Sequence, residues 1–286
     1  MSDTTEKISR PLERARLDDD QPTVHLDSGD DVLVLAREAT AEPPDDEPQP
    51  PEQPATGSGG DLEAEIIRLV AAAIANRPAR RTPVYDLAKR GLDIVVSGTL
   101  IALTLPIIGL LSLIIRVQSP GPAIFRQRRV GRDGRVIRFY KFRTMYSDAK
   151  ERFPELYDYR FTAEQFATSY YKPPVDPRNT PFGRALRKTT LDELPNLFNV
   201  IKGDVSLVGP RPELPELIQY YTPEQLTKFS VKSGITGLAQ VSGRNNLSIQ
   251  EQIALDVEYV QKRSFRYDLT LIARTAIMVV KRVGAE

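Results

Sequence analysis

The sequence contains no cysteine and only one histidine, His25. Without cysteine, the chain can form no disulfide bond, no thiolate metal site and no cysteine nucleophile. Because His25 lies in an acidic N-terminal stretch, we expect neither a histidine-based triad nor a histidine zinc site. Any chemistry must therefore come from carboxylates, hydroxyls, lysine, arginine, tyrosine or a metal ion bound by oxygen.

Charge is divided unevenly along the 286 residues, although the formal net charge is only +1. Residues 1–61 contain 16 acidic and 5 basic residues, a net charge of −11, and the remainder contains 22 acidic and 34 basic residues, a net charge of +12. A basic main part indicates an anionic partner, which can be a nucleic acid, anionic lipid headgroups or a phosphorylated substrate. Charge alone does not choose among these three.

Composition divides the chain into three regions. Residues 1–60 are acidic, rich in proline and poor in apolar residues, which predicts a disordered tail whose partner is unknown. Residues 61–84 are predicted to form a peripheral amphipathic helix and a linker, because apolar residues recur at helical spacing between Asp61, a suitable N-cap, and Pro78. Residues 85–286 are predicted to form the main domain.

Local patterns in the main domain favour short helices and a few strands. Residues 135–142 read as a strand. Ser248 and Glu251 form a capping box that predicts a helix continuing to Gln261, and residues 269–283 predict a terminal helix. The expected fold class is therefore α+β and mostly helical, with a small domain of short helices and a few strands next to a membrane segment.

That membrane segment is residues 94–115, IVVSGTLIALTLPIIGLLSLII, which carry no charge and can reach across a hydrocarbon core as a helix. A single straight transmembrane helix is one interpretation. Basic residues flank the segment on both sides, which favours placing both ends on the cytoplasmic face. Pro106, near the middle, removes a backbone hydrogen bond and breaks or kinks a helix. We therefore predict a re-entrant hairpin broken at Pro106, with the Thr104 hydroxyl available to a freed carbonyl.

A candidate catalytic pair lies in the stretch RALRKTTLDELPNLFNVIKGDVSLVG. Proline is tolerated in the first turn of a helix, so Pro195 places Asp192 and Glu193 at or just before a helix start. Backbone N–H groups there stabilise a carboxylate and attract phosphate. The alternative interpretation is purely structural, because Thr190 and Glu193 also fit a capping box.

Several cations accompany this pair. Arg187 precedes it, and a stiff Gly-Pro-Arg-Pro turn presents Arg211. Lys141 and Arg143 are two residues apart on the predicted strand and would share one face, and Arg244 lies in another turn. Each cation alone can equally be a solvated or lipid-facing charge. Together they indicate a phosphate or nucleotide site, for which the arginine fork is well suited.

Several long motifs follow one another in the order and spacing of a known family. They are KRGLDIVVS, SPGPAIFRQRRVG, FYKFRTM, DPRNTPFGRALRKTTLDELPNLFNVIKGDVSLVGPRPE, GITGLAQVSGR and LDVEYVQKRSF. Over residues 85–283 the chain resembles the bacterial sugar transferases, or monotopic phosphoglycosyl transferases, which start exopolysaccharide, O-antigen and glycoprotein glycan assembly. It departs from that pattern at Leu105, where many relatives have serine, and around residues 146–174, which are longer than in the smallest relatives.

The resemblance implies an enzyme, a magnesium-dependent phosphoglycosyl transferase of the bacterial inner membrane with its catalytic domain facing the cytoplasm. Asp192 would be the nucleophile and Glu193 its dyad partner, and both would ligate Mg²⁺. Asp192 would attack the sugar-bearing phosphate of a UDP-sugar, release UMP and form an aspartyl-phosphosugar. Polyprenyl (undecaprenyl) phosphate in the lipid bilayer would then accept the sugar-1-phosphate. The resemblance does not name the sugar.

Two other functions are compatible with parts of this sequence. A non-catalytic, membrane-anchored scaffold that binds anionic lipid would need only the basic surface and the apolar segment. A nucleic-acid binder would also explain the net charge of +12, but the basic residues are interleaved with proline, glycine and an apolar anchor, without a recognised reading helix. We therefore expect no nucleic-acid partner.

Overall fold

The computed structural model describes residues 59–76, 82–157, 159–169, 176–243 and 246–281. These residues are mostly helical and contain two small sheets of two strands each. The predicted α+β, mostly helical fold is confirmed. The predicted tail, residues 1–60, lies outside the described residues except for its last two residues, which begin a helix.

Helix α2 (Gly59–Asn76) confirms the helix predicted after Asp61, but its expected peripheral position is wrong. Ile66 and Val70 are buried in an apolar cluster with residues of the main domain. The helix lies so close to a turn of that domain that a Cβ atom on Gly134 would come within 3.0 Å of the Ile67 Cα. Its apolar face is therefore part of the core of the main domain.

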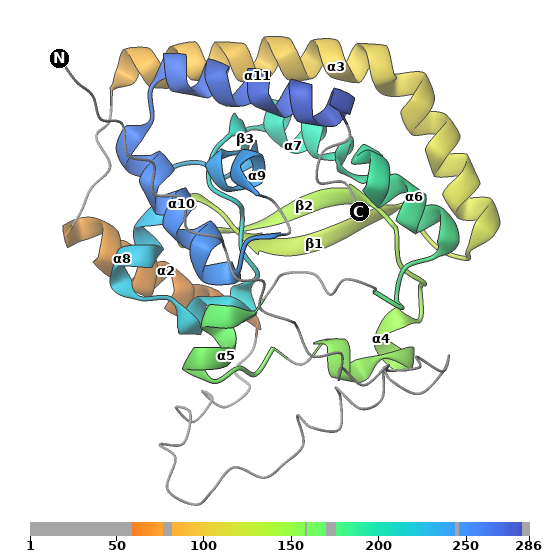
Figure 1. The fold of residues 1–286 in the computed structure, drawn as a ribbon, viewed down its shortest axis with the longest axis horizontal. Coiled ribbons are helices and arrows are strands. Elements are labelled where there is room, and N and C mark those ends of the chain that lie inside the picture. Colours follow the sequence, from red (N-terminus) through yellow and green to blue (C-terminus); the bar gives the residue numbers. More distant parts are fainter. Residues whose placement is uncertain (1–58, 77–81, 158, 170–175, 244–245, 282–286) are drawn as a thin grey trace, which may run out of the picture. The chain divides into compact units, whose positions relative to one another are not determined.

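Helix α3 (Pro83–Gln118) contains the apolar segment and extends beyond it at both ends. Among the described residues it is the one helix long and apolar enough to cross a membrane, and only 11% of its most apolar window is buried, so its apolar surface mostly faces outward. The helix continues through Pro106 and bends along its length (Figure 1). The Thr104 hydroxyl donates to the Leu100 carbonyl at 2.6 Å, a contact that favours bending. The re-entrant arrangement stays a prediction.

A buried carboxylate ties the start of α3 to the two C-terminal helices. These helices are α10 (Ile249–Lys262) and α11 (Phe265–Lys281). Asp268 is fully buried in α11 and accepts hydrogen bonds from Tyr85 at 2.8 Å, Lys89 at 2.7 Å and Tyr259 at 2.7 Å. Helix α11 consequently lies alongside α3 (Figure 1).

An antiparallel hairpin forms the floor of the candidate site. Its strands are β1 (Ile124–Val130) and β2 (Val136–Phe142). Strand β2 confirms the strand predicted at residues 135–142. Gln127 pairs with Phe139, and because side chains alternate along a strand, Arg129 and Lys141 project from the same face as this pair. That face points into the site described below.

A second, parallel sheet supports the Gly-Pro-Arg-Pro turn. Its strands are β3 (Ser206–Val208) and β4 (Gly234–Thr236). The two backbone segments approach very closely at the ends of these strands. A Cβ atom on Gly234 would lie 2.1 Å from the Gly209 nitrogen, and one on Gly209 would lie 2.4 Å from the Lys232 carbonyl oxygen. Only glycine fits at these two positions, so the sheet fixes where the turn begins.

Other short elements connect these parts. They are η1 (Arg132–Gly134), α4 (Ala149–Arg152), η2 (Pro154–Tyr157), α5 (Ala163–Thr168), η4 (Pro215–Tyr220), α8 (Pro223–Leu226), η5 (Thr227–Ser230) and α9 (Leu238–Ser242). The predicted capping box at the start of α10 is confirmed, because the Ser248 hydroxyl accepts from the Glu251 N–H at 3.2 Å. The terminal helix α11 is likewise confirmed, beginning a few residues earlier than expected.

Candidate active site

The predicted catalytic pair lies in a short turn between two helices. The elements are α6 (Pro181–Thr189), the 3-10 turn η3 (Leu191–Glu193) and α7 (Asn196–Lys202). Asp192 and Glu193 therefore precede a helix start, as Pro195 predicted. Thr190 adopts a left-handed conformation with φ of 59° and makes no capping bond through its side chain. The structural interpretation of a Thr190–Glu193 capping box is thus not what the structure contains.

Glu193 is held by a cation and an amide. One carboxylate oxygen accepts from the Lys141 ammonium group, and the other accepts from the side-chain amide of Asn196. Asn196 is completely buried. Sequence reasoning did not select it, although its position three residues after Glu193 at a helix start is a signal that could have found it. The pair of contacts orients Glu193 and keeps its charge matched by Lys141.

Helix α7 is fastened to strand β2, which explains why Lys141 meets Glu193. The Asn199 side chain accepts from the Tyr140 N–H at 3.0 Å and donates to the Arg138 carbonyl at 2.7 Å. At the other end of α7, the Arg90 guanidinium donates to the carbonyls of Val200 and Ile201, at 2.6 and 2.7 Å. These contacts fix α7, and with it the turn η3, against the hairpin.

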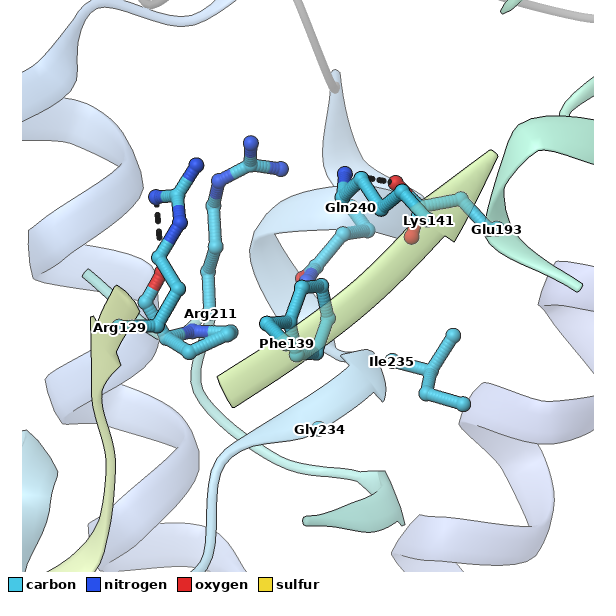
Figure 2. Close-up of a pocket in the computed structure, with 9 residues that line it drawn as sticks. Arg129, Phe139, Lys141, Glu193, Arg211, Gly234, Ile235 and Gln240 are labelled. Carbon is cyan, nitrogen blue, oxygen red and sulfur yellow. Dashed lines mark hydrogen bonds and ion pairs between the residues drawn. The ribbon is translucent and has the colours of Figure 1, made fainter. Parts of the chain in front are cut away.

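A pocket opens beside Glu193 (Figure 2). Its lining includes three cations, one carboxylate, an amide and an aromatic ring, namely Arg129, Lys141, Arg211, Glu193, Gln240 and Phe139. The charged groups of this lining sum to +2. The structure thus brings together three of the predicted residues, Lys141, Glu193 and Arg211. Arg129 and Gln240 were not predicted, although both lie within motifs that the resemblance used.

Arg211 is positioned by a buried carboxylate below the pocket. Both carboxylate oxygens of Asp256 accept from the backbone N–H of Arg211, at 3.2 and 3.1 Å. Burial raises the pKa of the Asp256 carboxyl, and the Lys228 ammonium group, 2.9 Å away, opposes that rise. Because Asp256 and Lys228 are each about 1% exposed, this pair forms a rigid support for the turn that carries Arg211.

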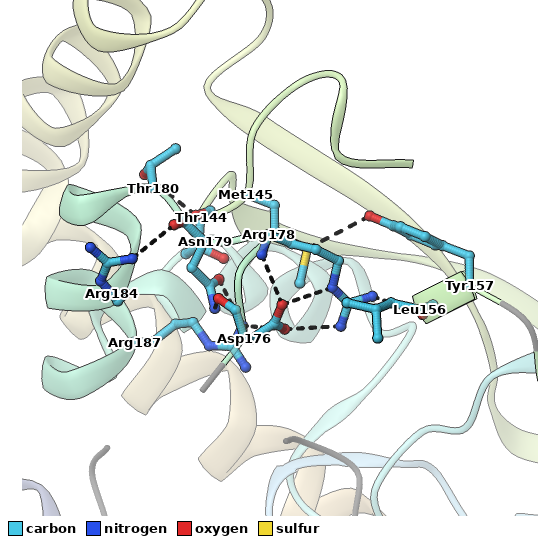
Figure 3. Close-up of polar contacts among 10 residues, drawn as sticks. All are labelled: Thr144, Met145, Leu156, Tyr157, Asp176, Arg178, Asn179, Thr180, Arg184 and Arg187. Atoms are coloured by element: carbon cyan, nitrogen blue, oxygen red, sulfur yellow. Dashed lines mark hydrogen bonds and ion pairs between the residues drawn. The ribbon is translucent and has the colours of Figure 1, made fainter. Parts of the chain in front are cut away.

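Three other predicted cations are not in this pocket. Arg143 donates to the carbonyls of Ser119 and Pro120, both at 2.6 Å, so it holds the C-terminal end of α3. Arg187 donates to Asn179 at 2.8 Å and lies 3.6 Å from Asp176 (Figure 3). Arg244 lies outside the described residues.

The cluster around Asp176 anchors the segment before α6. Arg178 makes a two-pronged contact with Asp176, at 2.8 and 2.9 Å, and also donates to the Leu156 carbonyl at 3.0 Å (Figure 3). Burial alone would raise the pKa of the Asp176 carboxyl, but the hydrogen bonds and charge of Arg178, with Arg187, hold it below its usual value. Arg187 therefore stabilises the fold in this conformation.

A metal ion would have to be held by few protein ligands. The described residues include no group of three or more histidine, aspartate or glutamate side chains that could cage an ion. Asp192 and Glu193 nevertheless offer hard oxygen ligands, and Mg²⁺ is commonly bound by one or two carboxylates together with substrate phosphates. The donor set therefore fits Mg²⁺ better than Zn²⁺.

Comparison with known proteins places this architecture in one family. The sequence model described as "Bacterial sugar transferase" matches residues 84–282. The chain is 42% identical over 202 residues to galactosyl transferase CpsE of Streptococcus agalactiae (70% of this chain, 44% of that protein). It is 38% identical over 213 residues to undecaprenyl-phosphate galactose phosphotransferase of Salmonella typhimurium (74% and 44%).

A third relative is covered more fully. The chain is 36% identical over 236 residues to UDP-glucose:undecaprenyl-phosphate glucose-1-phosphate transferase of Caulobacter vibrioides (78% of this chain, 83% of that protein). The chain spans less than half the length of the first two relatives. The match of the family model covers well over half of the chain, and the resemblance seen in the motifs is confirmed. The chain belongs to the bacterial sugar transferase family.

Proposed function

We propose that this protein transfers a sugar-1-phosphate from a UDP-sugar to polyprenyl phosphate, releasing UMP, as the first membrane step of an exopolysaccharide or O-antigen type of glycan. The observation that supports the proposal is the turn η3, in which Asp192 directly precedes Glu193, and Glu193 lines a pocket whose charged groups sum to +2. The names of two relatives, from Salmonella and Caulobacter, specify undecaprenyl phosphate, and the latter also specifies UDP-glucose. A phosphorylated donor and acceptor both suit such a pocket.

In the proposed reaction the Asp192 carboxylate is a covalent phosphoryl acceptor. A carboxylate oxygen forms a bond to the phosphorus that carries the sugar, and the bond from this phosphorus to the bridging oxygen breaks, so UMP leaves with the electron pair. A phosphate oxygen of the polyprenyl phosphate then attacks the same phosphorus and releases Asp192. Lys141 and Arg211 lower the barrier because they stabilise charge on the phosphate oxygens.

Asp192 and Glu193 would hold Mg²⁺ together with donor phosphates. The ion, when bound, supplies charge neutralisation at the phosphate oxygens. Glu193 would contribute through the orientation that Lys141 and Asn196 give it.

The transfer assay uses a panel of UDP-sugars with polyprenyl phosphate and Mg²⁺, and it follows UMP release. We expect release with one or a few sugars in the wild type and none above background for Asp192→Asn. Asp148→Asn, which changes an exposed carboxylate, is the control and should retain full activity. If Asp192→Asn replaces the wild-type protein in cells without loss of function, a non-catalytic scaffold that binds anionic lipid is the better explanation.

We also propose that α3 re-enters the cytoplasmic face of the bacterial inner membrane. Because the chain contains no cysteine, single cysteines can be placed without background. Val84→Cys and Val117→Cys lie near opposite ends of α3 and are 82% and 78% exposed. An impermeant thiol reagent added to intact spheroplasts should label neither, and it should label both after the membrane is opened. Labelling of one position in intact spheroplasts would establish a straight transmembrane helix instead.

A further inference from the structure

Arg129 is buried, whereas the two other cations of its pocket, Arg211 and Lys141, are half-buried (Figure 2). Its side chain is only 9% exposed. Its neighbours Arg126 and Arg128 alternate to the other face of β1 and are exposed. A guanidinium group this buried either balances a structural carboxylate or takes part in binding an anion.

The Arg129 guanidinium group is fixed in place. Its Nε and Nη2 atoms donate to the Gln127 side-chain oxygen at 3.1 and 2.8 Å. Its Nη1 atom donates to the Pro212 carbonyl at 3.3 Å and lies 3.7 Å from the Glu213 carboxylate. Pro212 and Glu213 directly follow Arg211, so the same contacts set the positions of both arginines. Figure 2 shows the two guanidinium groups directed toward the same side of the pocket.

A counterion role for Glu213 does not account for this arrangement by itself. The Glu213 carboxylate also accepts from the Tyr221 hydroxyl at 2.7 Å and lies 4.0 Å from the Lys228 ammonium group. Two guanidinium groups in one partly buried pocket repel each other, and an anion bound between them relieves that repulsion. A guanidinium group that is held in place by Gln127 and Pro212, next to a second guanidinium group, also suits the oxygens of a phosphate group.

We propose that Arg129 is a phosphate-binding residue that acts together with Arg211. The inference rests on the proposed function, because that function supplies the phosphate groups. The phosphate belongs either to the diphosphate of the donor nucleotide or to the polyprenyl phosphate acceptor, and the two sources are distinguished by separate measurements.

The experiment uses the full chain in detergent micelles. The Kd for UDP is measured by calorimetry, and the KM for polyprenyl phosphate is measured in the transfer assay. Arg129→Gln should raise the UDP Kd or the polyprenyl phosphate KM by about 10- to 100-fold, the range expected for the loss of a hydrogen bond to a charged group. A change in the UDP Kd assigns the donor diphosphate, and a change only in the polyprenyl phosphate KM assigns the acceptor. Arg126→Gln, on the exposed face of the same strand, should change neither value.

A double variant separates binding from charge balance. If Arg129 serves only to neutralise Glu213, the variant Arg129→Gln/Glu213→Gln should regain wild-type Kd and KM values, and this result would overturn the inference. If Arg129 binds phosphate, the double variant stays impaired while its melting temperature recovers. Unchanged Kd and KM in Arg129→Gln would also overturn it.

The proposed function can fail separately from this inference. A wild type that binds UDP through Arg129 but transfers no sugar would leave the phosphate site standing and refute the proposed reaction. Transfer that does not depend on Arg129 would do the opposite.

Discussion

Replacing Lys228 by methionine removes the ammonium group between two buried carboxylates, 2.9 Å from Asp256 and 4.0 Å from Glu213. Methionine preserves most of the side-chain volume, so the main loss is electrostatic. Breaking a buried ion pair by removing one partner costs about 3–5 kcal/mol. For a domain of this size each kcal/mol lowers the melting temperature by about 2–4 °C, so we expect a decrease of about 6–20 °C.

The assay is thermal unfolding in detergent micelles, followed by the far-ultraviolet circular dichroism of the helices. Lys262→Met is the matched control. Lys262 forms an ion pair with Glu258 at 2.8 Å, close to the 2.9 Å between Lys228 and Asp256, but this pair is exposed at the end of α10. This variant should leave the melting temperature unchanged within error. The variant Lys228→Met/Asp256→Asn should lose less stability than the two single variants combined, with a coupling of about 1–3 kcal/mol. Additive losses, or a Lys228→Met effect no larger than that of Lys262→Met, would refute the reasoning.

Three further predictions address other parts of the molecule. Ile66→Ala on α2 should lower the free energy of unfolding by about 2–5 kcal/mol, because Ile66 is buried in the core. Leu69→Ala, at a position 42% exposed, should lower it much less, and equal losses in chemical denaturation would mean that α2 is not part of the core. Lys141→Met should lower kcat for UMP release by about 100-fold, since it removes both a pocket cation and the partner of Glu193. Lys150→Met, on the exposed surface, is its control, and an unchanged kcat in Lys141→Met would exclude a role of Lys141 in the reaction. Asp176 has a lowered pKa in the folded state, so its contribution to stability is present above the unfolded pKa of about 3.9 and is lost as the pH falls through the folded pKa. Asp176→Asn should therefore melt at a lower temperature than the wild type at pH 7, and its melting temperature should fall less steeply between pH 5 and 3. A melting temperature that falls in parallel with that of the wild type would contradict the assignment.

Local signals predicted the elements that depend on neighbouring residues. The capping box at Ser248 located the start of α10, and Pro195 located the turn η3 relative to α7. The alternation of side chains along β2 directs Lys141 to the face that lines the pocket. Each of these features is decided within one turn or one strand, so the sequence contains the information directly.

Other features depend on contacts between distant segments. Arg143 follows the end of β2 and donates to the end of α3, so its spacing from Lys141 on a strand did not place both in one pocket. Arg187 meets Asp176, whose position depends on the fold of the intervening segment. The three-residue strands β3 and β4 are too short for a periodic pattern, and the burial of α2 depends on the groove that receives it. These are consequences of tertiary packing, which no local pattern contains.

The covalent role of Asp192 is tested most directly by intact-mass analysis of the wild-type protein mixed with its donor UDP-sugar and Mg²⁺ in the absence of polyprenyl phosphate. We expect a mass increase of one phosphosugar, located on Asp192 by peptide mapping, lost when polyprenyl phosphate is added and absent in Asp192→Asn. Sugar transfer that proceeds at a normal rate in Asp192→Asn, with no adduct in the wild type, would contradict it.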